Sequence, residues 1–251
     1  MKITRKDFLR FSGLALLAVA GRRAVRAVGE RASAPPAKPV RWGMVIDLQK
    51  CRQKDGCDRC IKACHSTHNV PQFADRAHEV KWIWKEPFQN VFPAAQTDYT
   101  REFYGNLPVL LACNHCDDPP CQDVCPVDAT WRREDGVVTI DWHRCIGCRY
   151  CMAACPYGAR SFNWQDPRPA IATVNPDFPT RTKGVVEKCN FCEERLAKGL
   201  GPACVESCEE KAIAFGDLER PDSEVRQVLR SRFAVQRQPE LGTGPSVYYL
   251  V

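Results

Sequence analysis

The sequence reads CNHCDDPPCQDVCP at residues 113–126 and CIGCRYCMAACP at residues 145–156. The second run has the spacing C-x2-C-x2-C-x3-C-P, in which three thiolates bind one [4Fe–4S] cluster and the fourth binds a neighbouring cluster. The first run keeps this order but places four residues, Asp117 to Pro120, where two are usual. The two runs therefore predict a two-cluster iron–sulfur module, in which each run supplies the ligand that the other lacks.

Sixteen cysteines are present in the chain of 251 residues, and they fall into four groups of four. Every group ends with a cysteine that follows the one before it after three residues. Disulfide pairing gives no reason for this repeat, so we favour metal binding over a disulfide-rich secreted binding protein. Structural zinc also uses paired C-x2-C units, but the x3-C-P endings favour iron–sulfur clusters. The candidate iron ligands are Cys51, Cys57, Cys60, Cys64, Cys113, Cys116, Cys121, Cys125, Cys145, Cys148, Cys151, Cys155, Cys189, Cys192, Cys204 and Cys208.

The formal net charge of +6 is concentrated in residues 1–34, which hold eight Lys and Arg against Asp7 and Glu30. The rest of the chain is balanced, with 28 basic and 28 acidic residues. Four clusters with their thiolates, each contributing about −2, would make this part acidic. The charge therefore gives no support to a nucleic-acid partner.

Residues 1–34 predict an export signal, with a basic start, an apolar run from Phe11 to Ala20 and small residues after it. The stretch TRKDFLR resembles the twin-arginine motif, with Lys6 in the place of the second arginine. That route carries folded proteins, so clusters are inserted in the cytoplasm and the mature protein is expected in the periplasm. The apolar run is too short to span a bilayer, which leaves an uncleaved anchor on the membrane surface as the alternative.

An internal repeat links the cysteine groups. RWGMVIDLQKC at residues 41–51 and VVTIDWHRC at residues 137–145 each read as a short strand that leads through an aspartate to the first cysteine of a group. An alanine follows four residues after Cys125, Cys155 and Cys208. These similarities predict repeated ferredoxin-like units and an α+β fold.

The two outer groups have wider spacings than the inner groups. Five residues separate Cys51 from Cys57, which makes Cys51 the least certain ligand, and eleven separate Cys192 from Cys204. Reciprocal ligation then pairs the first group with the last and the two middle groups with each other. The predicted architecture is two nested ferredoxin-like modules with long connecting loops, the inner at residues 113–160 and the outer at residues 35–112 with 161–251.

Four further segments carry predictions. HEVKWIWKE, residues 78–86, reads as a half-buried strand, for which core packing is favoured over a docking surface. DSEVRQVLRSR, residues 222–232, predicts an amphipathic helix, and SVYYL, residues 246–250, a closing strand. His65 and His68 are expected to form hydrogen bonds near a cluster, because the C-x-x-C-H pattern of attached haem is absent.

Three basic residues stand beside candidate ligands: Lys62, Arg149 and Lys188. A cation in such a position offsets the cluster charge and tunes the reduction potential. The alternative, which we favour for most of them, is an ordinary solvated charge.

The four cysteine groups resemble those of the four-cluster iron–sulfur subunits of membrane-anchored oxidoreductases, such as dimethyl sulfoxide and polysulfide reductases. The resemblance covers about residues 41–215. It implies four [4Fe–4S] clusters, and it implies the ligand sets Cys51, Cys57, Cys60 with Cys208; Cys189, Cys192, Cys204 with Cys64; Cys113, Cys116, Cys121 with Cys155; and Cys145, Cys148, Cys151 with Cys125.

RWGMVIDLQKC, the wide gap before GCDRCIKACHSTHNVP, and EVKWIWKEP are similar to the periplasmic iron–sulfur subunits (DsrO) of the DsrMKJOP complexes of dissimilatory sulfur metabolism. In those subunits the wide gap is a family trait. The resemblance implies peripheral binding to the cytoplasmic membrane through a polytopic quinone-reactive subunit, with a multihaem cytochrome c and further redox subunits nearby.

The expected role is that of an electron relay without a catalytic site of its own. Single electrons would pass through four clusters between the quinone-reactive membrane subunit and the other redox subunits. The sequence presents no convincing nucleophile–base pair and no phosphate-binding glycine loop. The alternative within the same class is the relay subunit of a molybdopterin oxidoreductase, which would use the same cysteines with a different partner.

Overall fold

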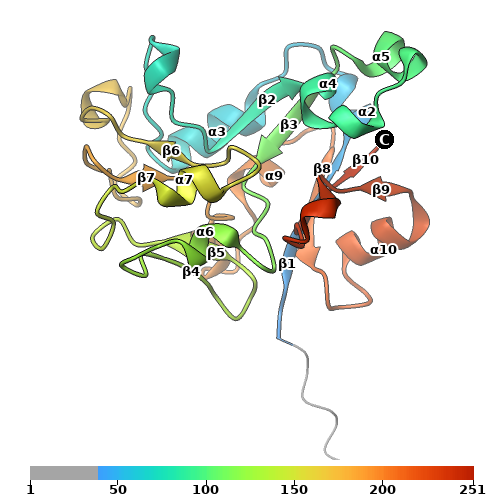
Figure 1. Cartoon of the computed structure of the whole chain (residues 1–251). Helices are drawn as coiled ribbons and strands as arrows, with labels where there is room; N and C mark the ends of the chain where they lie inside the picture. The colour runs from blue at the N-terminus through green and yellow to red at the C-terminus, as the bar shows by residue number, and fades with distance from the viewer. Residues whose placement is uncertain (1–38) are drawn as a thin grey trace, which may run out of the picture. The chain divides into compact units, whose positions relative to one another are not determined.

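The structure, a computed structural model, describes residues 39–251, which form one compact unit (Figure 1). The predicted export signal at residues 1–34 lies outside the described residues. Among residues 39–251, no helix is both long enough and apolar enough to cross a lipid bilayer.

The largest sheet has four strands in the order β8-β1-β10-β9. β1 (Trp42–Asp47) pairs antiparallel with β8 (Ile213–Asp217) and parallel with β10 (Val247–Leu250), and β9 (Ala234–Val235) completes the sheet beside β10. The strand predicted before Cys51 and the closing strand near the C-terminus are therefore confirmed, and they lie side by side.

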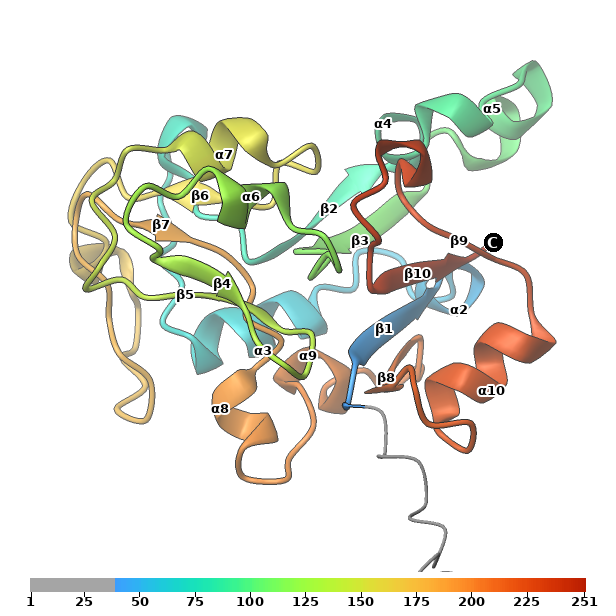
Figure 2. The same ribbon diagram turned by 60° about the horizontal axis from the view of Figure 1, so that its bottom comes forward.

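The two faces of this sheet pack against different parts of the chain. Alternate residues of a strand point to opposite faces, so Met44 and Ile46 enter the main core while Val45 packs on the other face. α10 (Glu224–Ser231) covers that second face with the fully buried Val225 (Figure 2). The predicted amphipathic helix is confirmed, and it begins where the Ser223 side chain accepts the N–H of Arg226.

Three two-stranded sheets carry the remaining strands, and all are antiparallel. They pair β2 (Ile83–Pro87) with β3 (Pro108–Ala112), β4 (Thr130–Arg132) with β5 (Val138–Ile140), and β6 (Ser161–Phe162) with β7 (Val186–Glu187). Figures 1 and 2 show the last two sheets gathered on the opposite side of the unit from α10.

The other helices are short, and the mixture of helix and sheet confirms the predicted α+β class. They are α2 (Leu48–Arg52), α3 (Arg59–Thr67), α4 (Phe88–Val91), α5 (Asp98–Tyr104), α6 (Pro120–Asp123), α7 (Tyr150–Ala154), α8 (Glu193–Leu196) and α9 (Ala203–Glu206), with 3-10 turns at Arg76–His78, Pro93–Ala95, Arg168–Ala170 and Pro239–Leu241.

The tryptophan-rich segment before β3 lies in the core. Trp82 is fully buried and Trp84 is 8% exposed, so the core-packing interpretation is confirmed. Ile83, between them, is also buried. Val80, Trp82 and Trp84 are buried on one side as expected, and Lys81 on the other side keeps 29% of its side chain exposed, so the buried Ile83 is the departure from the half-buried pattern.

Candidate iron–sulfur centres

Each cysteine group lies on the same succession of strand, loop and short helix. β1, β3, β5 and β7 lead into the four groups in chain order, and α3, α6, α7 and α9 carry the third cysteine of each group. Because a helical turn takes 3.6 residues, the x3-C ending places the fourth cysteine about one turn beyond the third.

The helices that carry the third cysteine of each group pack against one another in two pairs. α3 packs against α9, and α6 packs against α7 (Figures 1 and 2). The first group is thereby brought to the last, and the two middle groups are brought to each other.

Three cavities are each lined by one of the cysteine sets that the resemblance implies, and we number them by site. Site I is Cys51, Cys57, Cys60 and Cys208; site III is Cys113, Cys116, Cys121 and Cys155; site IV is Cys125, Cys145, Cys148 and Cys151.

The remaining four cysteines, which we call site II, are Cys64, Cys189, Cys192 and Cys204. All four are buried. Burial raises the pKa of Cys64 well above its ordinary value, and the thiolates of Cys189, Cys204 and Cys192 raise it further, which places the four sulfurs together. The structure thus assembles the same four sets, and their roles as iron ligands stay a prediction.

The chemistry of the donor sets fits iron–sulfur clusters. All sixteen cysteines are free, with none joined in a disulfide. Burial raises the pKa of Cys60 to about 11 and that of Cys116 to about 12, so four adjacent thiolates are unfavourable without a compensating positive centre. A bound metal supplies that charge and deprotonates a coordinating thiol.

The alanine that recurs four residues after the last cysteine of a group forms a backbone hydrogen bond to that cysteine. Its N–H donates to the cysteine sulfur four residues earlier, from Ala129 to Cys125 at 3.2 Å and from Ala212 to Cys208 at 3.3 Å. Both alanines are buried, which leaves no room for a larger side chain. Such N–H···S bonds stabilise negative charge on a cluster and raise its potential.

Gly147, inside site IV, is held in a backbone conformation that only glycine tolerates here. Its φ is +70°, and a β-carbon at this position would overlap the carbonyl oxygen of Gly184. The glycine therefore lets the loop between Cys145 and Cys148 pass close to Gly184.

We expect the Gly147→Ala variant to lose the cluster of site IV, because the new β-carbon would overlap Gly184 and displace the loop between Cys145 and Cys148. Iron should fall from about sixteen to about twelve atoms per chain, measured on anaerobically purified protein. Gly158→Asp is the matched control, since Gly158 also has positive φ but meets no atom within 4 Å of an added β-carbon. An unchanged iron content in Gly147→Ala would contradict the steric argument.

Sites I, II and III adjoin one another. Burial raises the pKa of Cys64 in site II. Neighbouring thiolates, among them that of Cys60 in site I, raise it further. Burial raises the pKa of Cys189 in site II to about 12, and the nearby thiolate of Cys113 in site III contributes to the rise. Site II therefore lies between sites I and III.

Site IV extends the series beyond site III. Burial raises the pKa of Cys151 in site IV, and the nearby thiolate of Cys121 in site III contributes to the rise. The sites thus follow one another in the order I, II, III, IV. The interior of the series is the better buried part, because the two end sites each have three partly exposed cysteines: Cys51, Cys57 and Cys208 in site I, and Cys125, Cys145 and Cys148 in site IV.

The three basic residues singled out in the sequence have different surroundings. Lys188 is buried and its ammonium group donates to the carbonyl oxygen of Cys189 at 2.8 Å. Lys62 is solvated, with 75% of its side chain exposed, and Arg149 lies over the rings of Phe162 and Trp164. The tuning interpretation therefore suits Lys188 best.

The sequence interpretation missed Arg160, which is 5% exposed. Its Nη2 donates to Cys121 Sγ at 3.0 Å, and its Nη1 donates to Thr130 Oγ1 at 3.1 Å. The only sequence signal was a basic residue five positions after Cys155.

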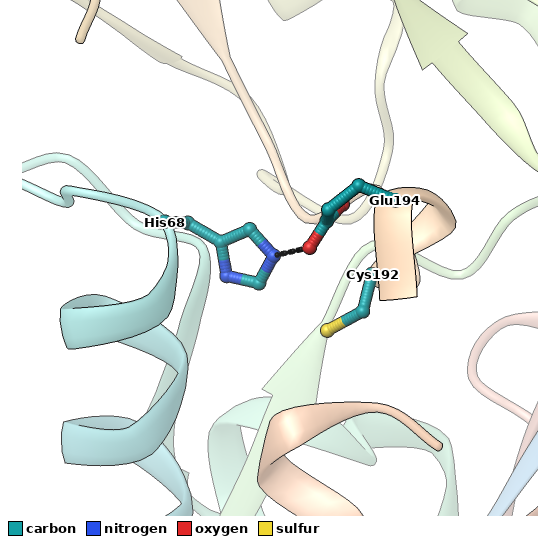
Figure 3. Close-up of side chains that lie close together, drawn as sticks. All are labelled: His68, Cys192 and Glu194. Atoms are coloured by element: carbon teal, nitrogen blue, oxygen red, sulfur yellow. Dashed lines mark hydrogen bonds and ion pairs between the residues drawn. The ribbon is translucent and has the colours of Figure 1, made fainter. Parts of the chain in front are cut away.

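His68 forms hydrogen bonds beside site II, as predicted. Its Nε2 lies 2.9 Å from Glu194 Oε1 (Figure 3). Its Nδ1 lies 2.9 Å from the carbonyl oxygen of Cys64, and its ring stacks on Trp82. The ligand atoms of His68, Cys192 and Glu194 lie within 4.8 Å of one another. Since both histidine nitrogens have partners and Cys192 belongs to site II, we interpret this group as the wall of site II.

A buried ion pair fixes the strand that leads into Cys189. Arg181 Nη2 lies 2.6 Å from Glu187 Oε2 on β7, and both side chains are at most 1% exposed. Glu187 also accepts the indole N–H of Trp82 at 2.9 Å and the amide of Asn163 at 2.5 Å. The pair therefore joins β7 to the tryptophan-rich segment.

Comparison with known proteins supports the cluster interpretation. Residues 108–170 and 175–218 match the 4Fe-4S dicluster domain. The match and the sixteen cysteines fit four [4Fe–4S] clusters as the cofactors of this chain.

Three curated relatives span most of the chain. The Hdr-like menaquinol oxidoreductase iron-sulfur subunit 1 of Archaeoglobus fulgidus is 42% identical over 229 residues, covering 83% of this chain and 82% of the relative. A putative iron-sulfur subunit of dimethyl sulfoxide reductase from Halobacterium salinarum is 42% identical over 211 residues (83% and 78%). The menaquinone reductase, iron-sulfur cluster-binding subunit of Nitratidesulfovibrio vulgaris is 39% identical over 236 residues (84% and 89%).

Proposed function

The chain belongs to the family of 4Fe-4S iron–sulfur subunits of oxidoreductase complexes, and from this we propose that it relays single electrons between a quinone-reactive membrane subunit and the other redox subunits of a dissimilatory sulfur-metabolism complex. The observation that carries the proposal is the succession of sites I to IV, with a buried interior and two partly exposed ends. A bound [4Fe–4S] cluster supplies a one-electron couple at each site.

The proposed ligand sets follow the reciprocal pattern. Sites I and II take ligands from the first and last cysteine groups and form the outer module, and sites III and IV take ligands from the two middle groups and form the inner module. The pairing of α3 with α9 and of α6 with α7 supports this nesting.

The residues of this chain hold, shield and tune the clusters, and in the proposed role they make and break no substrate bonds. The buried cysteines of site II exclude water from the middle of the series. The N–H groups of Ala129 and Ala212 donate to ligand sulfurs, where they favour the reduced state.

The proposed partners are a polytopic quinone-reactive membrane subunit, a multihaem cytochrome c and further redox subunits. Two relatives carry menaquinol or menaquinone in their names, which supports a quinone-linked partner. The proposed location is the periplasm, reached after folding, with peripheral attachment to the cytoplasmic membrane through the partner.

The second candidate is the relay subunit of a molybdopterin oxidoreductase. The identity of 42% with a putative dimethyl sulfoxide reductase subunit favours it as strongly as the menaquinol relative favours the first. The two candidates share all cysteines and differ in the chains that would be found with them.

Anaerobic purification of the native complex tests both. We expect about sixteen iron and sixteen acid-labile sulfide per chain, and four one-electron signals in a redox titration followed by electron paramagnetic resonance. Iron near zero would reject the relay. A co-purifying large molybdopterin subunit would reject the sulfur-complex assignment in favour of the second candidate.

A further inference from the structure

Arg160 is a buried cation whose charge is not balanced by a carboxylate. Among residues 39–251, no Asp or Glu forms an ion pair with it. Burying an unpaired guanidinium costs several kcal/mol, so its presence calls for another negative partner nearby.

The negative partners that surround Arg160 are thiolates. Its Nη2 donates to Cys121 of site III at 3.0 Å, while Thr130 holds the other arm of the guanidinium at 3.1 Å.

Three of the repeated units can be compared at the position five residues after the last cysteine, and one of them has a cation there. Thr130 follows Cys125 by five residues, Arg160 follows Cys155 by five, and Ile213 follows Cys208 by five. Equivalent backbone positions therefore hold a hydroxyl, a cation and an apolar group.

Other cations near the sites donate hydrogen bonds to backbone carbonyl oxygens. Lys85 donates to the carbonyl oxygen of Cys57, and Lys188 donates to that of Cys189. Within the described part of the chain, Arg160 donates a guanidinium hydrogen bond to the sulfur of a proposed ligand, while the imidazole Nδ1 of His68 lies 3.7 Å from the sulfur of Cys64.

We infer that Arg160 is a positioning residue that raises the reduction potential of site III relative to sites I and II, through its hydrogen bond to the sulfur of Cys121. Reduction adds one negative charge to a cluster, and a buried cation at hydrogen-bond distance stabilises that charge. The inference rests on the proposed relay, and it adds an internal gradient to it.

Arg160→Gln in the full complex tests the inference, with the four potentials measured by redox titration under electron paramagnetic resonance. We expect the reduction equilibrium constant of site III to fall roughly tenfold, which is about 59 mV for a one-electron step. Sites I and II should stay unchanged. The signal that a Cys116→Ser variant loses identifies site III.

Lys62→Gln is the matched control, because it removes an exposed charge that stands between two proposed ligands, Cys60 and Cys64. All four potentials should remain as in the native protein. Arg160→Lys keeps the charge but not the two-armed hydrogen bonding, so a smaller fall at site III is expected.

The inference is overturned if Arg160→Gln leaves all four potentials in place, or shifts all four equally. Should that variant fail to assemble its clusters, Arg160→Lys decides, and unchanged potentials there overturn the inference. Absence of clusters from the native complex would instead defeat the proposed function, so the two failures are distinguishable.

Discussion

Cys192→Ser is expected to stop electron transfer through the protein while leaving about twelve of its sixteen iron atoms in place. Cys192 belongs to site II, which lies between sites I and III, and it is 4% exposed. A serine hydroxyl is a poor ligand compared with a thiolate, so site II is lost. Since the sites stand in series, the loss of an interior site interrupts electron transfer between site I and site IV.

The measurements are iron content and turnover of the purified complex with its own redox partners. Ser207→Ala is the control, because Ser207 lies next to Cys208 and its hydroxyl bonds the carbonyl oxygen of Cys204, yet it offers no sulfur. The control should keep sixteen iron atoms and native turnover. Native turnover with twelve iron atoms in Cys192→Ser would show that electrons bypass site II.

Glu187→Gln is expected to lower the free energy of unfolding by about 3 kcal/mol, the low end of the cost of breaking a buried ion pair. The low end applies because Arg181 keeps its bonds to the carbonyl oxygens of Asn69 and Pro179, at 2.9 and 2.8 Å. The thermal midpoint of cluster absorbance should drop by roughly 10 °C, at about 2–4 °C per kcal/mol for a chain of this size.

Asp222→Asn provides the comparison, because it breaks the exposed pair with Arg220, whose side chains are 65% and 69% exposed. An exposed pair of this kind contributes little to stability. Equal midpoints for Glu187→Gln and Asp222→Asn would show that the buried pair adds no stability.

The sequence predicted most reliably what is encoded locally. Cysteine spacing, the aspartate before the first cysteine and the alanine after the fourth each act within a few residues, and the structure gives each a contact: Asp47 accepts the N–H of Lys50, and Asp141 accepts that of His143. The amphipathic helix at residues 222–232 and the strands beside Cys51 and at the C-terminus follow from hydrophobic patterning in the same way.

Contacts between residues that are far apart in the sequence produce no local sequence pattern. Arg160 and Thr130 are thirty positions apart, and Trp82 meets Glu187 across more than a hundred. A single buried charge looks the same in the sequence as a surface charge, which is why Arg160, Arg181 and Glu187 were not singled out. The burial of Ile83 was missed for a related reason, since its strand partner is Ala112, 29 positions along the chain.

The pairing of β1 with β8 and β10 has a consequence for biosynthesis. β1 precedes its partner strands, residues 213–217 and 247–250, by more than 160 positions, so the large sheet cannot close until those residues have been translated. Within residues 113–160, β4 pairs with β5 and α6 packs against α7. Pairing of distant segments is the slow part of folding. Assembly should therefore begin with these local pairs of the inner module, before the large sheet closes.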